Sequence, residues 1–292
     1  MHRTIVSCST MNKYESELTE AITKMATELP PDVYSALKRA SEDETGEVAN
    51  KQLKTIVKSI EISYKEKLPI CQDTGLVSAY ITGEYVKDHL LIKEGLEKAV
   101  SKLTENGTIR PTIVSPIKRE PVIGNVGIGE PEVYLDFEGE SSIKLMMRGA
   151  GSENYSTLKM LLPSTSPHEI NKIILEQTLE AGGRICPPSI VSVAIGGSPA
   201  SAILSSRKAL FSKVGERSGI DEVAEWELKL QRALNSLNVG PMGLGGIHTV
   251  LDVKIRLLDT HIAMLPLAIT FSCWALRRIQ IKRVGSVDEI MW

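Results

Sequence analysis

Residues 68–81 have the sequence Leu-Pro-Ile-Cys-Gln-Asp-Thr-Gly-Leu-Val-Ser-Ala-Tyr-Ile, and the pattern of the whole chain changes here. The Leu-Pro-Ile segment ends a helical pattern, and Leu76–Ile81 is a short apolar run typical of a buried strand. The polar segment Cys71–Gly75 joins the two. Because loops at the ends of strands often carry functional groups, this stretch predicts a helical region before it, a sheet after it and a candidate site between them.

The residues before this stretch predict helices. Apolar side chains recur at helical spacing over residues 15–29 and again over residues 48–64. Pro30-Pro31 ends the first helix and suits the first turn of a second one, which continues over residues 33–40.

The residues after it mix strands and helices. Strand patterns occur over 132–137, 141–147, 190–195, 249–258 and 267–271, and helical patterns over 88–103, 168–181, 199–211 and 220–237. The mixture predicts an α/β fold, with a helical N-terminal part followed by mixed or antiparallel sheets flanked by helices. Residues 138–140 are expected to form a hairpin turn. We expect one domain over residues 1–292, with a subdomain boundary near 163–167.

The composition is that of an ordinary globular protein. The 292 residues are 42% hydrophobic and 24% charged, and the formal net charge is −2. The chain is therefore not of a disordered or collagen-like class, and no basic excess indicates nucleic acid or an anionic membrane as a partner. The apolar runs are shorter than the ~20 residues of a membrane span. Residues 1–11 lack the apolar core of a signal peptide, so we expect a cytoplasmic protein.

Cysteine usage points to a metal cofactor. No C-x-x-C pair occurs, and disulfides are not expected in the cytoplasm. Cys71, Cys186 and Cys273 each lie at the edge of a predicted strand, whereas Cys8 lies in a terminus expected to fray. Three thiolates permit an iron–sulfur cluster with one iron open to a substrate oxygen, because electron-transfer clusters normally have four cysteine ligands. The alternative is that each cysteine is a small buried hydrophobe.

Several other groups are candidates for binding an anion or moving a proton. The glycines of Gly149–Gly151 let backbone N–H groups approach an anion, or simply form a tight turn. Arg110 and the pair Arg277-Arg278 are able to bind a carboxylate in a bidentate fork, although isolated arginines are usually surface residues. His261 is either a hydrogen-bond donor to a substrate carboxylate or a histidine whose hydrogen bonds are satisfied within the fold. Asp73 would either handle a proton or cap a turn.

Five motifs, taken in order, resemble the iron-dependent class I fumarate hydratases. They are Ile70–Gly75, Arg148–Asn154, Cys186–Pro188, Gly240–Gly246 and Cys273–Arg278. The resemblance runs from about residue 15 to the end and is strongest to the α subunit of the two-subunit form, of which the L-tartrate dehydratase α subunit is a close relative. It implies a [4Fe–4S] cluster on Cys71, Cys186 and Cys273, and reversible hydration of fumarate to (S)-malate.

The resemblance also implies roles for individual residues. Asp73 falls at a catalytic position, and the substrate-contacting positions are Gln72, Arg110, Gly149, Gly151 and His261. Single-chain members carry a second, C-terminal domain, whereas this sequence ends at Trp292. The resemblance therefore implies a separate β subunit, a hetero-oligomer and an active site shared between the two subunits. Where many members have Asn-Thr-Gly-x-Asn, residues 118–125 are Lys-Arg-Glu-Pro-Val-Ile-Gly-Asn, so we assign no role to this loop.

The sequence leaves alternatives open both for the substrate and for the class of protein. The Gly-Ser-Glu-Asn segment at 151–154 favours fumarate, with L-tartrate or mesaconate as alternatives within the family. A non-catalytic iron–sulfur protein is a further alternative, which three rather than four cysteines disfavour. A dinucleotide-binding enzyme is supported only by glycines that lack an anchoring motif.

Overall fold

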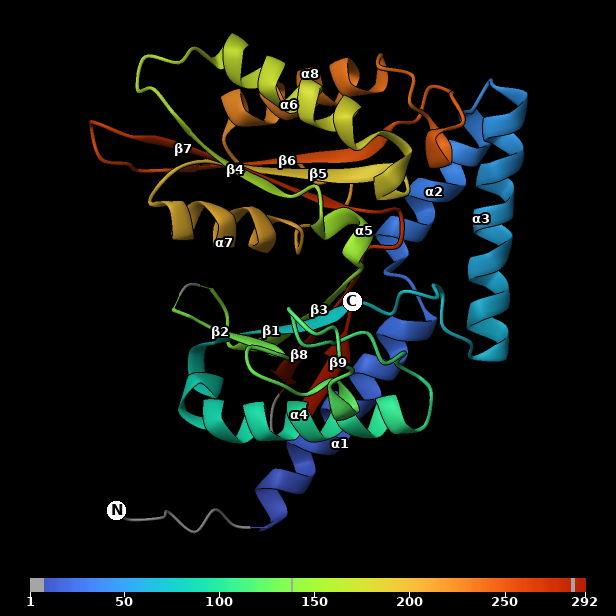
Figure 1. Ribbon diagram of the computed structural model, residues 1–292, viewed down its shortest axis with the longest axis vertical. Coiled ribbons are helices and arrows are strands. Elements are labelled where there is room, and N and C mark those ends of the chain that lie inside the picture. Colours follow the sequence, from blue (N-terminus) through green and yellow to red (C-terminus); the bar gives the residue numbers. More distant parts are fainter. Residues whose placement is uncertain (1–7, 138, 285–286) are drawn as a thin grey trace. The chain divides into compact units, whose positions relative to one another are not determined.

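The fold is described from a computed structural model (Figure 1), which covers residues 8–137, 139–284 and 287–292, with side chains from residue 14 onward. The chain forms two compact units. The first contains the described residues up to Pro30, Ile60–Arg148 and Arg277–Trp292, and the second contains Pro31–Ser59 and Gly149–Leu276. We call them the five-stranded unit and the four-stranded unit after their sheets.

The five-stranded unit packs two helices on one face of its sheet. The strand order is β2-β1-β3-β8-β9, with β1 and β2 parallel and the other pairs antiparallel. Its elements are α1 (Cys8–Thr27), the end of α3 (Glu47–Glu66), β1 (Leu76–Thr82), η1 (Gly83–Asp88), α4 (His89–Glu105), η2 (Ile123–Asn125), β2 (Glu132–Asp136), β3 (Ser142–Arg148), β8 (Arg277–Val284) and β9 (Val287–Met291).

The core of this unit explains why these segments are helices and strands. Leu18 and Ile22 recur along one face of α1, Leu96 lies on the inner face of α4, and Ile143 and Ile279 alternate inward from the sheet. All five are buried in one apolar cluster. The helical period of α1 and α4 and the two-residue period of the strands therefore bring apolar faces together.

The hairpin expected at 138–140 is wrong, because β1 lies between the two strands that it would join. β1 pairs in parallel with β2 and antiparallel with β3. The burial pattern gives the reason: β1 is buried along nearly its whole length and so suits a central position, whereas β2 is only half-buried and forms an edge. Glu138, in the expected turn, lies outside the described residues.

The four-stranded unit has helices on both faces of its sheet. The strand order is β4-β7-β5-β6, with β5 and β6 parallel and the other pairs antiparallel. Figure 1 shows α6 and α8 on one face and α7 on the other. The elements are α2 (Pro31–Asp43), the start of α3, α5 (Ala150–Glu153), β4 (Thr157–Leu161), α6 (Pro167–Ala181), η3 (Gly182–Ile185), β5 (Ser189–Gly196), α7 (Pro199–Ala209), α8 (Asp221–Asn235), η4 (Pro241–Gly243), β6 (Val250–Leu258) and β7 (Leu265–Ser272).

Side-chain size decides which helices cover which face. Val191 and Val193 of β5 belong to the large apolar cluster shared with α6 and α8. On the other face, Ala194 packs with Ala202 of α7, and the Ser192 hydroxyl donates to the carbonyl of Ser206 at 2.6 Å. Small residues on this face let α7 lie close to the sheet.

The α/β fold with N-terminal helices followed by two mixed sheets is confirmed. The sequence patterns did not predict three of the strands, namely β4, β8 and β9. β8 has the sequence Arg-Arg-Ile-Gln-Ile-Lys-Arg-Val, and only Ile279 and Ile281 mark its inward face. Residues 163–167 lie inside the four-stranded unit, where they follow β4 and end at the first residue of α6, and the single-domain assignment stays a prediction. No helix in the described part of the chain is long and apolar enough to cross a membrane.

Candidate active site

Three of the candidate residues surround one cavity in the five-stranded unit. The cavity has a volume of about 340 Å³. Cys71, Gln72 and Arg110 lie in its wall, and the other lining residues are Pro69, Thr74, Gly107, Thr108, Ile109 and Pro111. The backbone N–H of Arg110 donates to the Thr74 hydroxyl at 3.0 Å, which ties the arginine loop to the cysteine loop. The structure thus brings together a thiol, an amide and a guanidinium from segments that are far apart in the sequence.

The cysteine loop is held at both ends. Before it, the N–H of Ile70 donates to the carbonyl of Ala26 at 2.8 Å. After it, Gly75 has φ +82°, and a Cβ there would lie 2.3 Å from the carbonyl oxygen of Arg148, so this position requires glycine. In the middle, Arg277 Nη2 donates to the carbonyl of Asp73 at 3.1 Å. Asp73 is half-buried and is not among the residues that line the cavity, so its catalytic role stays a prediction.

Asn125 positions the arginine loop and was missed by the sequence analysis. Its Oδ1 accepts hydrogen bonds from the N–H groups of Thr112 and Ile113 at 2.8 and 3.0 Å. Its Nδ2 donates to the carbonyl of Arg110 at 2.9 Å and to the Thr104 hydroxyl at 3.0 Å. Asn125 ends the 118–125 segment, to which the sequence analysis assigned no role. A Gly-Asn pair, which favours positive φ, is the local signal that could have identified it.

We expect Asn125→Ala to lower the free energy of unfolding by about 2–4 kcal/mol, since it removes all four bonds of a buried side chain at a positive φ. Urea denaturation followed by circular dichroism measures this. The control is Asn106→Ala, which removes one bond, to the N–H of Thr108, from an exposed side chain and should cost less than ~1 kcal/mol. Equal effects of the two changes would show that Asn125 does not hold this loop.

The other two candidate cysteines share one end of the sheet in the four-stranded unit. Cys186 precedes β5 and Cys273 follows β7, and these antiparallel strands pair Ile190 with Ser272. The N–H of Trp274 donates to the carbonyl of Cys186 at 3.2 Å, which links the two cysteine loops directly. In the described part of the chain Cys71, Cys186 and Cys273 are half-buried and form no disulfide bond.

The Gly-rich loop at 240–246 supports the Cys186 turn. The N–H of Met242 donates to the carbonyl of Pro187 at 2.8 Å. Gly243 has φ +77°, and a Cβ there would lie 2.7 Å from the Cα of Gly183. The loop therefore packs backbone against backbone beside Cys186, which is a structural role and not that of a P-loop.

A buried carboxylate anchors the end of the Gly-rich loop. Glu44 accepts hydrogen bonds from the N–H of Ile247 at 3.0 Å and from the N–H of Gly46 at 2.9 Å. The neighbouring His248 is half-buried, and burial lowers the pKa of its imidazole, while the negative charges of Glu44 and Asp43 act in the opposite direction.

The glycines at 149 and 151 lie beside the segment that leads to Cys186. Gly149 is the extended residue before the short helix α5, and a Cβ on Gly151 would lie 3.2 Å from the carbonyl oxygen of Arg184. Arg184 belongs to η3, which ends immediately before Cys186. This placement is compatible with the role predicted for the turn, which stays a prediction.

His261 lies away from the two cysteines of its own unit. It belongs to the connection between β6 and β7, at the left of Figure 1, and β6 ends where Leu258 pairs with Gly196 at the end of β5. Cys186 precedes the start of β5, so about 25 Å of strand separates them, at ~3.3 Å per residue. Nδ1 of the exposed His261 accepts from the N–H of Ala263 at 3.1 Å. The geometry of this unit gives its predicted role no support.

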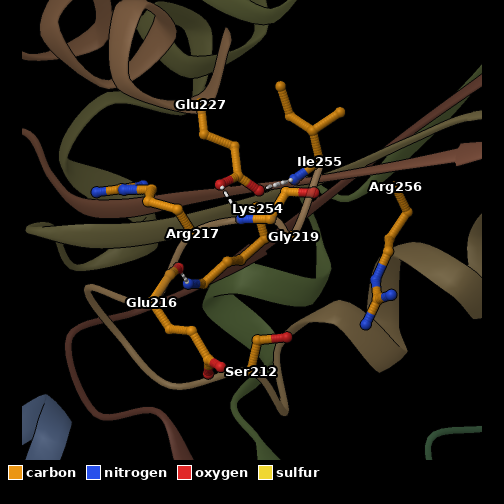
Figure 2. A pocket seen from close by; sticks show the side chains of 9 residues that line it. Ser212, Glu216, Arg217, Gly219, Glu227, Lys254, Ile255 and Arg256 are labelled. Carbon is orange, nitrogen blue, oxygen red and sulfur yellow. Dashed lines mark hydrogen bonds between the residues drawn. The ribbon is translucent and has the colours of Figure 1, made fainter. Parts of the chain in front are cut away.

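A second cavity, of about 220 Å³, lies beside β6 and is lined by none of the candidate residues (Figure 2). Three charged side chains that line it, Arg217, Lys254 and Glu227, have ion-pair or hydrogen-bond partners. Buried Asp252 forms ion pairs with Arg217 at 2.6 Å and with Lys254 at 2.9 Å. Glu227 accepts from the N–H groups of Ile255 at 2.9 Å and Ser218 at 3.1 Å. These contacts fasten the connection between α7 and α8 to the sheet, so we assign the network to stability.

Comparisons with known proteins place the chain in a family. The family model described as fumarate hydratase (fumerase) matches residues 15–282. A putative L(+)-tartrate dehydratase subunit alpha from Methanocaldococcus jannaschii is 38% identical over 279 residues, which are 93% of this chain and 98% of the relative. The L(+)-tartrate dehydratase subunit alpha of Escherichia coli K12 is 28% identical over 282 residues, 94% of this chain and 93% of the relative.

A putative class I fumarate hydratase from Geobacillus stearothermophilus is 29% identical over 293 aligned positions, which are 96% of this chain and only 57% of the relative. The resemblance inferred from the five motifs is thus confirmed at the level of the family. Because the family model and the relatives cover most of the sequence, the chain belongs to the fumarate hydratase (fumerase) family of iron–sulfur hydro-lyase alpha subunits.

Proposed function

We propose that the chain is the α subunit of a [4Fe–4S]-dependent hydro-lyase for a four-carbon dicarboxylic acid, and that a separate β subunit completes its active site. Two relatives that match over nearly their whole length are named as alpha subunits, which supports a β partner. The Geobacillus relative is much longer than the matched region, as expected if some members hold both parts in one chain.

The donor set fits an iron–sulfur cluster. Cys71, Cys186 and Cys273 are half-buried thiols at strand ends, and thiolates are the usual ligands of such clusters. Among the described residues, no three or more His, Cys, Asp or Glu side chains group as ligands of a single metal ion. A four-iron cluster has a different requirement, because its thiolates bind separate irons. When bound by three cysteines, the cluster would supply one open iron as a Lewis acid for a substrate oxygen.

The chain's own residues would bind and orient the substrate. The exposed guanidinium of Arg110 would donate two hydrogen bonds to one carboxylate of the substrate at the wall of the cavity. The amide of Gln72, in the same wall, would add a hydrogen bond. Asp73 would hold the proton that is exchanged when water is added or removed. Backbone N–H groups near Gly149–Gly151 are proposed to assist.

The comparisons favour L-tartrate over fumarate as the substrate to test first. The Gly-Ser-Glu-Asn segment by itself favoured fumarate. The observation with most weight is the 38% identity to a putative tartrate dehydratase subunit along nearly the whole of both chains. Fumarate stays the second candidate, since the family model and the Geobacillus relative carry that name. The proposed reaction is therefore dehydration of L-tartrate, or else hydration of fumarate or its methylated form mesaconate.

Anaerobic co-production with the β subunit encoded in the same genome tests the proposal. Iron content and consumption of L-tartrate, fumarate and mesaconate are measured on one preparation. We expect about four irons per α chain and the highest kcat/KM with L-tartrate. The α chain alone should bind the cluster but show little turnover, and full activity without a partner would refute the shared site. A fully loaded complex that acts on none of the three acids would indicate a non-catalytic iron–sulfur protein.

A further inference from the structure

Arg277 is a buried cation with an incomplete set of partners. Its side chain is 1% exposed, and it is among the largest fully buried side chains of the chain. Nη2 donates to the carbonyl of Asp73, but the buried Nε and Nη1 have no hydrogen-bond partner among the described residues. No described carboxylate forms an ion pair with it. The guanidinium therefore places a positive charge inside the fold.

The register of the sheet places this charge beneath the Cys71 loop. Arg277 pairs with Met147 at the end of the five-stranded sheet where Leu76, just after the loop, pairs with Arg148. Ile279 and Ile281, two and four residues further along β8, face the apolar core. Because side chains alternate along a strand, Arg277 lies on that same face, at the end of the core. Its one hydrogen-bond acceptor is the carbonyl two residues after Cys71.

Burial of a lone cation is unfavourable unless an anion compensates it. Within this unit, the cysteine thiolate at the head of the loop is the anionic group that the proposed function supplies. A cluster held by three thiolates carries net negative charge, and nearby charge is one of the factors that set its reduction potential.

We propose that Arg277 is a positioning residue for the cluster, fixing the backbone between Cys71 and Asp73 and compensating the negative charge of the cluster and its thiolate. This inference rests on the proposed function. The hydrogen bond from Arg277 to the carbonyl of Asp73 holds the loop that contains Cys71. The positive charge of Arg277 favours the reduced state of the cluster. Arg277 therefore raises the reduction potential of the cluster and opposes oxidative loss of iron.

The test uses the α–β complex loaded with iron under anaerobic conditions. Arg277→Gln removes the charge, and Arg277→Lys keeps it without the planar fork. Arg283→Gln is the matched control, because it removes a charge from the same strand at a side chain that is 40% exposed and paired with Asp288. Iron content and the midpoint potential of the cluster are measured, the latter by a redox titration followed by electron paramagnetic resonance.

We expect Arg277→Gln to shift the midpoint potential to a more negative value and Arg283→Gln to leave it unchanged. Arg277→Lys should keep a potential close to that of the wild type while incorporating iron more slowly, because the bond to Asp73 is weakened. A loaded Arg277→Gln complex with the wild-type potential would overturn the charge role.

If Arg277→Gln does not fold, the potential and the iron incorporation of Arg277→Lys test the proposal in its place. The wild-type potential with slowed iron incorporation supports the proposal, and a potential displaced to negative values overturns it. A wild-type complex that binds no iron would instead mean that the proposed function has failed, so the two failures are distinguishable.

Discussion

Cys71→Ser, Cys186→Ser and Cys273→Ser will each remove most of the bound iron and abolish turnover, because a serine hydroxyl is a poor substitute for a thiolate ligand of an iron cluster. The loss should be of similar size at each position, since each thiolate is proposed to bind a separate iron. Iron per α chain and the visible absorption of the complex after anaerobic reconstitution measure this effect. Circular dichroism separates loss of the cluster from loss of the fold.

Cys8→Ser is the control for this series. The sequence gives Cys8 no role, and its side chain lies outside the described ones. We expect the wild-type iron content for this variant. A Cys71→Ser complex with a full complement of iron would remove Cys71 from the ligand set and, with it, the link between the cluster and the cavity that also contains Arg110 and Gln72.

Arg110→Ala should leave the cluster intact and lower kcat/KM by roughly 30-fold to several-thousand-fold. The estimate is the ~2–5 kcal/mol that loss of one partner from a desolvated charge pair costs, at ~1.4 kcal/mol per tenfold. It applies to the proposed α–β complex, in which the β subunit would cover the Arg110 side chain that is exposed in the α chain. Arg110→Lys should lie between the wild type and the alanine variant, because lysine keeps the charge but not the bidentate fork. Steady-state kinetics on the α–β complex, with iron content measured in parallel, checks both.

Lys118→Ala is the matched control, since it removes an exposed cation from the same loop region. We expect less than a twofold change in kcat/KM, which is less than ~0.5 kcal/mol. If Arg110→Ala has unchanged kinetics and only a lower melting temperature, Arg110 braces its loop and the substrate carboxylate binds elsewhere, for example on the β subunit.

The parts of the fold that could be predicted are those marked by local sequence signals, such as caps and hydrophobic periodicity. The start of α6 combines Ser166, Pro167 and Glu169, and the structure shows the complete capping box there. The pairing of β1 with both β2 and β3 was not predictable in the same way, because strand partners are chosen by burial across the whole sheet. β8 was not predicted as a strand because four of its eight residues are Lys or Arg.

The residues of the candidate site also divide into those with a local sequence signal and those placed only by the tertiary structure. The cysteines and Arg110 stand out by residue type and by the turn-forming residues around them. Asn125 does not, because its importance comes from four hydrogen bonds to residues 12 to 21 positions away, which no local pattern reveals. Arg277 was recognised only as a possible carboxylate ligand, and its burial beneath the Cys71 loop depends on the register of β8 with β3.

The sequence by itself determined the chemistry available to this protein, namely three thiols at strand ends, an arginine loop and the motifs of one hydro-lyase family. Only the tertiary structure decided which of these groups meet. It placed Cys71 beside Arg110 around one cavity, joined the Cys186 and Cys273 loops at one end of a sheet, and put His261 at the opposite end. The physical reason is range: residue type and turn propensity act over a few positions, whereas strand register is set by burial and hydrogen bonds between segments distant in the chain.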